Sequence, residues 1–572
     1  MSRHFDPVLT ELIQNELSSI TEEMAIVIWR TGQSAMMKAG DFATAVCDAQ
    51  GRVIGQGFAA PMQLAVFDEL LKCVCSRFDG HFEHGDVIIT NDPYNGMSHM
   101  PDIAVVTPVV IEGRIAAFCV AYSHHADVGG RFPGSSSSYC RTSYEEGVRI
   151  PLVKFKRGSP TGDAVFDLVC ANVRVPDEWR SDMNAKLAGC AKGAEQAAQM
   201  VGRYGWDSYT AACDHLVEHA ARSMRAAIAA TPDGVFEADY VIPDDEGRAG
   251  ADLHMKLTLR VEGDRIAADF TGTCAQVDRA LNCPFSFTKA AVAAALKTLI
   301  GPELPMNRGF TESVDVIAPP GSLLNPIFPS AVGGRAVVFY AIYDLVNQAL
   351  AKAMPADVPA MGEGADLLHF SGTDASGNEF AFIDLFYGGW GARPTKDGIH
   401  GVAPVFLGSY GCASAELLEA DYPIVVEQFG YVPGTGGAGT YSGSVAVARE
   451  WRFLCEGNAM IRSVRLEAPP SLMGGVRGAA PRTMHTHSGR EADLGLKTHV
   501  HVHVQPGDRL YHSTAGAGGF GSPHARDVQD VARDVRAGLL DREQALRLHG
   551  VCITDAGDVD PAATDRVRKE LA

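Results

Sequence analysis

The N-terminal part of the chain shows the apolar spacing of a long helix and then of strands. Apolar side chains recur every three or four residues between Leu9 and Ile28, which predicts a helix with one face on a core. Asp6 and Pro7 are typical of a helix start, and we expect the helix to end near Gly40. Shorter elements are then expected in this order: a strand at 42–47, a helix at 66–77 and a strand at 86–90.

Two short apolar runs, at 105–111 and 115–120, follow these elements. Glu112-Gly113-Arg114 lies between them and is a typical turn sequence, so the pattern predicts a β-hairpin. A hairpin brings together the residues that flank its two outer ends. We therefore expect the segment before the first run to lie beside the segment after the second.

Histidine and aspartate residues gather at these two outer ends. They are His99, Asp102, His124, His125 and Asp127. Imidazole nitrogens and carboxylate oxygens bind divalent transition metals, and three protein ligands leave a position for water or substrate. We therefore predict a metal site, and Asp41, just before the strand at 42–47, is a candidate further ligand. The alternative interpretation is that these are polar residues of solvated loops.

Beyond residue 130 the pattern predicts helices, then strands, then a β-rich end. The expected elements are helices over 180–230, strands over 235–273, helices at 288–299 and 336–354, and a last amphipathic helix over 527–549. We therefore expect a mixed α+β, multi-domain protein. Its regions are an N-terminal α/β metal-site region at 1–230, a central α+β region at 231–364, and a β-rich C-terminal region with a terminal helix at 365–572.

Three further motifs bear on chemistry. His499, His501 and His503 alternate with valines and share one strand face, which we expect to be solvated rather than metal-binding. Glycine-rich segments at 434–439 and 516–521 are expected to form tight turns, with phosphate binding by backbone N–H groups as the alternative. The chain has no Gly-x-x-x-x-Gly-Lys-Ser/Thr sequence, so ATP, if it is used, must be bound by a partner.

Composition excludes several function classes. The net charge of −20, without a basic stripe, argues against binding to nucleic acid. No apolar run is long enough to cross a membrane, and the first seven residues lack the apolar segment of a signal peptide. The 13 cysteines are scattered without a Cys-x-x-Cys pair, which is typical of a reducing compartment. We expect a cytoplasmic protein that binds neither nucleic acid nor membrane.

Several segments together carry a resemblance to a known family. The most specific are Asn91-Asp92-Pro93-Tyr94, 97–102 and 121–130. Others are 41–42, 48–51, 146–151, 269–273, 307–309, 320–322, 388–393 and 516–521. Over essentially its whole length the chain resembles the hydantoinase B/oxoprolinase family. Ala515 and Ala517 depart from the proline and glycine usual there, and an acidic residue often found near position 142 is absent.

The resemblance implies one subunit of an ATP-dependent enzyme. In such enzymes an A-type partner of acetate-kinase/actin-like fold phosphorylates an amide or enolate oxygen, and the B-type chain supplies a divalent metal. Carried over to this sequence, the ligands fall on Asp41, His99 and His124, with Asp102 as a further ligand in the carboxylase branch. We expect zinc, with manganese and iron compatible, and a heterotetramer of two A-type and two B-type subunits.

The expected reaction is the opening of a lactam, hydantoin or oxoproline ring after its carbonyl oxygen is phosphorylated. Asp127 or His125 would orient a ligand or transfer a proton. The residues expected to bind substrate or activated intermediate are Asn91, Asp92 and Arg393. One alternative is a ketone carboxylase of the acetone or acetophenone type, whose metal site holds bicarbonate or carbon dioxide. Another is a non-catalytic assembly scaffold with a structural histidine cluster.

Overall fold

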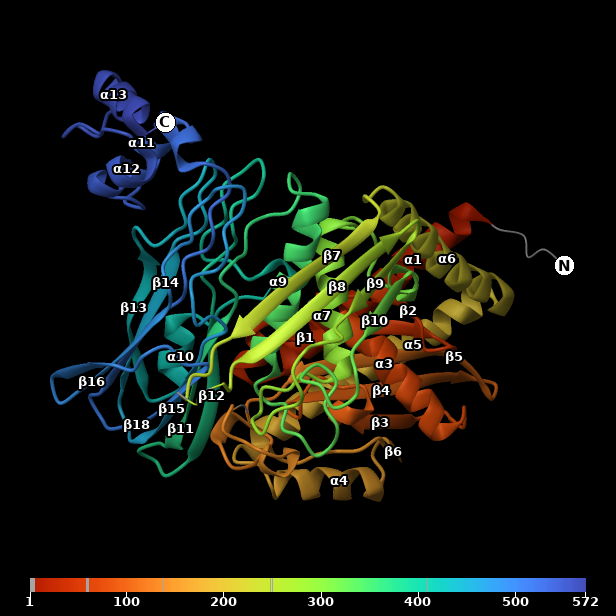
Figure 1. Ribbon diagram of the computed structural model, residues 1–572. Helices are drawn as coiled ribbons and strands as arrows, with labels where there is room; N and C mark the ends of the chain where they lie inside the picture. Colours follow the sequence, from red (N-terminus) through yellow and green to blue (C-terminus); the bar gives the residue numbers. More distant parts are fainter. Residues whose placement is uncertain are drawn as a thin grey trace.

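The computed structural model describes residues 6–57, 61–135, 137–246, 248, 250–408 and 410–571. Residues 1–5, part of the segment in which no signal peptide is expected, lie outside these ranges. Within them the chain forms helices and four β-sheets (Figure 1), which confirms the predicted mixed α+β architecture. Among the helices that the structure describes, none combines the length and apolarity needed to cross a membrane.

An antiparallel sheet in the N-terminal region carries the hairpin at its centre. Its strands, in spatial order, are β2 (Val53–Gln56), β1 (Phe42–Asp48), β5 (Arg114–His124), β4 (Asp102–Ile111), β3 (Asp86–Thr90) and β6 (Val153–Lys156). Alternate residues of β1 enter two different cores, Ala43 and Ala45 on one face and Phe42 and Val46 on the other. The sheet is therefore buried on both faces.

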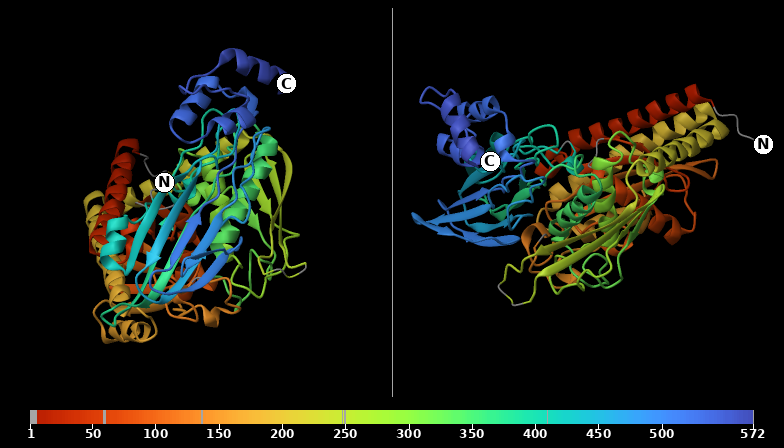
Figure 2. Two further views of the ribbon diagram at one scale, coloured as in Figure 1. Left: turned by 90° about the vertical axis from the view of Figure 1, so that its left-hand side faces the viewer. Right: turned by 45° about the horizontal axis from the view of Figure 1, so that its top comes forward.

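Helices cover both faces of this sheet. On one face lie α1 (Pro7–Thr31) and α5 (Pro176–Tyr204), with α6 (Trp206–Ala229) alongside (Figure 2) and α4 (Pro160–Cys170) against β6. On the other face lies α3 (Pro61–Phe78), which packs on α7 (Phe285–Leu299). The predicted helices over 180–230 are thus two helices that meet at Gly205, which has a left-handed φ of 80°.

The predicted hairpin is confirmed. β4 pairs with β5 so that Asp102 stands opposite His124 and Ile111 opposite Arg114. The two residues of the turn, Glu112 and Gly113, have φ values of 49° and 74°. Two left-handed residues in succession form the turn type whose twist matches that of the flanking strands. The register fixed by this turn brings the two outer ends of the hairpin together.

The first predicted helix is shorter than expected. α1 ends at Thr31, and a separate helix, α2 (Ala35–Ala39), runs up to Gly40. Between them Gly32 is extended, and the backbone N–H of Gln33 donates to Asp182 Oδ1 at 2.8 Å. Ser34 then caps α2 by accepting from the Met37 N–H. The apolar spacing gave no sign of this break, because the acceptor comes from α5.

The central region packs a second sheet against a helix. The strands of the sheet are, in spatial order, β10 (Val314–Ile317), β9 (Arg265–Asp269), β8 (Leu253–Glu262) and β7 (Gly234–Ile242). The helices of this region are α7, α8 (Arg308–Thr311) and α9 (Arg335–Ala353). α9 packs on β7 and β8 and also on α7. One buried apolar cluster extends from Met36 to Val464. The three regions predicted from the sequence therefore share a core. The boundaries between them, near residues 230 and 364, stay a prediction.

The C-terminal region is a sandwich of two antiparallel sheets. One holds β12 (Glu379–Phe386), β11 (Asp366–Thr373), β15 (Gly457–Arg462) and β18 (His499–Val504), in that order. The other holds β13 (Ile424–Val432), β14 (Ala446–Phe453), β19 (Arg509–Ser513), β16 (Arg482–His487) and β17 (Arg490–Asp493), and α10 (Ala415–Asp421) packs on β13. The apolar residues between the sheets form a cluster of their own.

The end of the chain forms a small helical group beyond the sandwich (Figure 1). It consists of α11 (Val528–Arg536), α12 (Arg542–His549) and α13 (Pro561–Leu571). The prediction of one helix over 527–549 was therefore wrong. Gly538, with a left-handed φ of 72°, ends the first helical segment, and Asp541 caps the second by accepting from the Gln544 N–H.

A buried ion pair joins the two sheets of the sandwich. Arg449 of β14 and Asp384 of β12 are both fully buried, with Nη1 and Oδ1 2.7 Å apart, and Trp451 Nε1 donates to Asp384 Oδ2 at 2.9 Å. We predict that Asp384→Ala lowers the free energy of unfolding by about 3–5 kcal/mol, because Arg449 is left buried without its partner. Chemical denaturation followed by tryptophan fluorescence measures the change.

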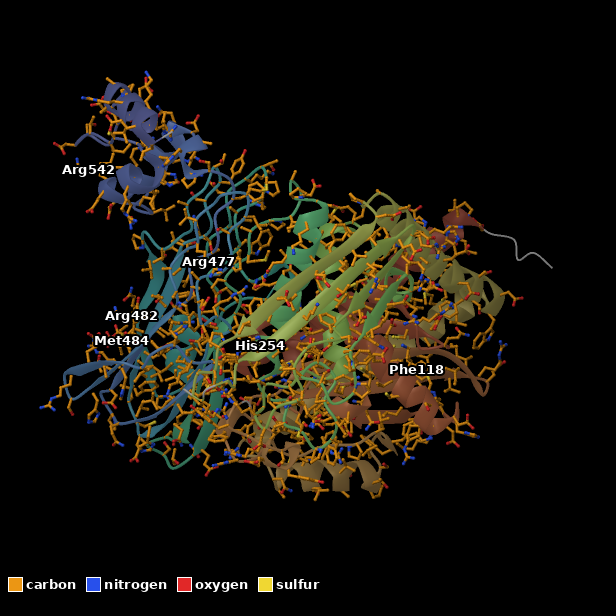
Figure 3. The ribbon with its side chains drawn as sticks, in the orientation of Figure 1. Phe118, His254, Arg477, Arg482, Met484 and Arg542 are labelled. Atoms are coloured by element: carbon orange, nitrogen blue, oxygen red, sulfur yellow. The ribbon has the colours of Figure 1, made fainter. Side chains whose placement is uncertain are left out.

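The matched control is Asp493→Ala on β17. Asp493 pairs with Arg482 (labelled in Figure 3), but both side chains are more than half exposed to solvent. An exposed pair contributes little, so we expect a change within about 0.5 kcal/mol. Equal losses in the two variants would contradict a stabilising role for the buried pair.

Candidate metal centre

Three polar side chains meet where the hairpin opens. Asp102 is the first residue of β4 and His124 the last of β5, so their pairing is fixed by the strand register. His99 precedes them in a tight turn in which its carbonyl accepts from the Asp102 N–H at 3.1 Å. The His124 N–H donates to the carbonyl of Asp41, just before β1, at 3.2 Å. The local sequence thus gathers these residues at one end of the central strands of the sheet.

The ligand atoms of three of these residues converge. Asp102 Oδ1 lies 3.0 Å from both His99 Nε2 and His124 Nδ1, and the two nitrogens are 3.1 Å apart. All three side chains are buried. In the part of the chain that the structure describes, this is the single group of three or more His, Cys, Asp or Glu residues placed to hold a metal ion.

The other oxygen of Asp102 is surrounded by donors. Oδ2 accepts from Tyr122 Oη at 2.7 Å, from Arg335 Nη2 at 2.9 Å and from the Ser98 hydroxyl. Burial by itself raises the pKa of Asp102, but His99 and Arg335 outweigh it and hold the pKa well below its ordinary value. The carboxylate is therefore ionised, with Oδ1 facing the histidines.

The donor set fits a divalent ion. Burial, with Arg335 nearby, lowers the pKa of His99 to about 3, so its imidazole is neutral and free to bind a metal through a nitrogen. Ligand atoms bound at about 2.1 Å lie about 3.0 Å apart at octahedral angles and about 3.4 Å apart at tetrahedral angles. The three atoms here, 3.0–3.1 Å apart, are close to that range, and a cation would relieve the repulsion between their lone pairs.

A cavity of about 60 Å³, which we call the metal cavity, adjoins the cluster. The N-terminal sheet, α9 and the face of β11, β12 and β15 that is turned away from the sandwich core enclose it. Its polar lining consists of Asp41, Asp102, Tyr122, His124, Arg335, Tyr340, Tyr410 and Arg462. Asp41, predicted as a ligand, lies in this lining but outside the three-residue group, and its Oδ1 accepts from Gln63 Nε2 at 2.9 Å and from the Tyr410 hydroxyl.

His125 and Asp127, predicted to act in catalysis, lie behind the ligands. His125 Nε2 is 2.8 Å from Lys186 Nζ, and its ring packs on Trp179. Asp127 accepts from Arg174 Nη1 at 2.7 Å and from the Gly129 N–H. Neither belongs to the cavity lining. Their contacts hold the loop that follows β5, directly after His124.

Asn91 and Asp92, predicted to bind substrate, also make structural contacts. Asn91 donates to the carbonyls of Met100 and Val148 and accepts from the Ile150 N–H at 2.6 Å. Asp92 caps the short 3₁₀ helix Pro93–Asn95 and is 3.3 Å from Arg149 Nη1. These contacts use all the hydrogen-bonding groups of the Asn91 amide and place both residues outside the lining of the metal cavity.

Arg393, predicted to bind the intermediate, lines a different and larger cavity of about 290 Å³. Its Nε donates to the Asp397 carbonyl at 3.1 Å. Tyr340 lines both this cavity and the metal cavity, so the two adjoin. The structure thus does not bring Arg393 to the metal cluster.

The prediction for the histidines of β18 was wrong at one position. His501 and His503 are exposed as expected, but His499 is fully buried. His499 pairs with Arg462 on β15, and its ring lies against Gly334 at the start of α9. Strand period alone cannot show that the first residue of a strand is covered by another part of the chain.

The polar cavity residues that the sequence did not predict are Tyr122, Arg335, Tyr340, Tyr410 and Arg462. Arg335 begins the apolar helix α9, and Arg462 ends the apolar strand β15. Both arginines could have been found from the sequence, because each is a charged residue within an apolar segment. Such a residue is usually paired or functional when it is buried. Tyr410 stands in a loop and has no such signal.

Comparison with known proteins identifies a family and a shared fold. The sequence matches the family described as hydantoinase B/oxoprolinase over residues 6–523. The caprolactamase subunit beta of Pseudomonas jessenii is 28% identical over 575 residues, which cover 98% of each chain. The crystal structure of the ATP-dependent caprolactamase from Pseudomonas jessenii has a TM-score of 0.89 at 26% identity, covering 99% of this chain and 100% of that one.

A second solved structure shows the same fold at lower identity. The nucleotide-free structure of an acetone carboxylase has a TM-score of 0.87 at 17% identity. The superposition covers 100% of this chain and 83% of the carboxylase chain. The shared architecture therefore extends to a protein named for a different reaction.

We predict that the purified chain holds about one divalent ion and that His124→Ala weakens its binding by more than about 100-fold, because a direct ligand is removed. Metal analysis after dialysis, together with a titration of the apo chain, measures this. The control is His503→Ala, since His503 is exposed and pairs with Glu456. Unchanged metal affinity in the His124 variant would exclude this residue as a ligand.

Proposed function

This chain belongs to the hydantoinase B/oxoprolinase family, and we propose that it is the metal-bearing subunit of an ATP-dependent enzyme that opens a cyclic amide. The observation that carries the proposal is the convergence of the ligand atoms of His99, Asp102 and His124 beside a cavity that Asp102 and His124 line. The caprolactamase match along the whole chain supports a ring-opening reaction over other uses of such a site.

The proposed reaction needs a partner. An unstrained amide carbonyl is a poor electrophile, and phosphorylation of its oxygen makes the carbonyl carbon reactive. This chain has no phosphate-binding loop sequence, and its relative in Pseudomonas jessenii is named a subunit. We propose that an A-type subunit of acetate-kinase/actin-like fold binds ATP and phosphorylates the lactam, hydantoin or oxoproline, in a complex of two A-type and two B-type chains.

His99, Asp102 and His124 would hold the metal, with Asp41 in the same cavity as a further ligand. A divalent ion bound there supplies Lewis acidity, which lowers the pKa of water and polarises a substrate oxygen. Zinc is the proposed ion, and manganese and iron suit the same imidazole and carboxylate ligands.

The surrounding residues fix the ligands in place. Arg335 and Tyr122 hold Asp102 so that one oxygen faces the histidines. Lys186 on His125 and Arg174 on Asp127 hold the loop after His124, so we propose that His125 and Asp127 are positioning residues. Asn91 and Asp92 brace the loop before His99 in the same way.

A ketone carboxylase is the second candidate. The metal cavity, at about 60 Å³, is of a size to hold bicarbonate, and its lining carries two arginines. The fold is shared with acetone carboxylase. In that reaction the same ligands would hold bicarbonate or carbon dioxide against an activated enolate.

Turnover tests the proposal. The chain, co-purified with an A-type subunit, is given lactams, hydantoins, 5-oxoproline, and ketones with bicarbonate, and product and ADP are measured. We expect ring opening that needs both ATP and metal. His124→Ala and Asp41→Ala should lower kcat by at least about 100-fold, because each removes a proposed ligand, whereas His503→Ala should keep full activity.

The panel also separates the two candidate reactions. Carboxylation of a ketone without ring opening would replace the hydrolase by the carboxylase. Full activity of His124→Ala would exclude a catalytic metal at this site, and full activity of Asp41→Ala would exclude Asp41 as a ligand.

A further inference from the structure

Two arginines from distant parts of the chain meet at the metal cavity. Arg335 opens α9 and Arg462 ends β15, and both line the cavity beside Asp102 and His124. Their exposed fractions are 5% and 7%, so they have almost no access to bulk water. A buried guanidinium is costly unless hydrogen bonds and negative charge compensate it.

The two guanidinium groups are only partly satisfied by hydrogen bonds and charges within the protein. Arg335 Nη2 donates to Asp102 Oδ2, and its Cζ lies 4.8 Å from the centre of the Phe287 ring, which fixes the guanidinium plane. Arg462 Nη2 donates to the Ala365 carbonyl at 3.1 Å. The Nε of each arginine is buried without a hydrogen-bond partner among the described residues. No described carboxylate lies within salt-bridge distance of Arg462, and Asp366 and Asp41 act on its charge only from farther away.

The charges around the cavity indicate the charge of the ligand that would fit it. Among the residues that line the cavity, the two carboxylates of Asp41 and Asp102 equal the two guanidinium groups in number, and a bound divalent ion would add two positive charges. Burial lowers the pKa of Arg462, and the like charge of Arg335 also lowers it, whereas Tyr340, Asp366 and Asp41 raise it without reversing the shift. A ligand with about two negative charges restores neutrality, and a phosphoryl group carries that charge near neutral pH.

We propose that Arg335 and Arg462 form an oxyanion clamp that binds the phosphoryl group of the activated substrate beside the metal ligands. The planar N–H fork of arginine matches phosphoryl oxygens. This inference rests on the proposed function, because the activated amide is the molecule that brings a phosphoryl group to the cavity.

The size of the cavity fits one part of such a substrate. A volume of about 60 Å³ has room for a few water-sized groups, comparable to a phosphate ion. The remainder of the substrate needs a second space. The cavity of about 290 Å³, which shares Tyr340 with the first, is the space that we assign to it.

Inorganic phosphate is the probe for the clamp. Calorimetric titration of the metal-loaded full-length chain with phosphate should show binding, and Arg462→Gln should weaken it at least tenfold while metal content stays the same. Arg462 contacts no metal ligand in the structure, so it separates the clamp from the metal site. Arg462→Lys keeps the charge but loses the fork, and should give an intermediate affinity.

Arg393→Gln is the matched control. Arg393 lines only the larger cavity, so this variant should bind phosphate like the unchanged protein. Equal phosphate affinity in Arg462→Gln, Arg462→Lys and the unchanged chain would overturn the proposal. If Arg462→Gln does not fold, Arg462→Lys alone decides, by the same comparison.

Bicarbonate, titrated in the same way, distinguishes the source of the oxyanion. Binding of bicarbonate but not phosphate, dependent on Arg462, would overturn the phosphoryl assignment. Phosphate binding that depends on Arg462, in a chain that opens no cyclic amide with its partner, would uphold the clamp and overturn the proposed function instead.

Discussion

The buried carboxylate of Asp102 is the interaction on which the centre of this structure depends. A carboxylate removed from water must be met by donors and positive charge. Tyr122 and Arg335 both donate to one of its oxygens, from β5 and from the start of α9. That oxygen is thereby satisfied, and the other faces His99 and His124. The same contacts attach the N-terminal sheet to the central helix.

The part of the site that the sequence predicted is the part that forms locally. The hairpin follows from two apolar runs and a short turn, and its register places Asp102 opposite His124 without help from the remainder of the chain. Period-two and period-3.6 patterns report such local order directly. For the same reason the strands at 42–47 and 86–90 agree with β1 and β3.

The features that the sequence did not predict depend on distant contacts. Arg335 and Asp102 are 233 residues apart in the sequence, and Tyr410 and Asp41 are 369 apart. A local pattern of apolar and polar residues cannot predict such pairs. The break after α1 needs Asp182 of α5, and the burial of His499 needs the start of α9. Arg393 illustrates the converse. It was predicted to bind substrate or intermediate, but it lines the larger cavity, whose walls come from the central and C-terminal regions.

The shared core has a consequence for the order in which the protein assembles. The walls of the metal cavity span Met36 to Arg462, and one apolar cluster runs through all three regions. During synthesis the histidine pair leaves the ribosome several hundred residues before Tyr410 and Arg462 do. Until those residues arrive, the hairpin end is an open, hydrated surface, and closing it requires contacts of very long sequence separation, which form slowly. The growing chain thus carries an incompletely enclosed His–Asp cluster for most of its translation.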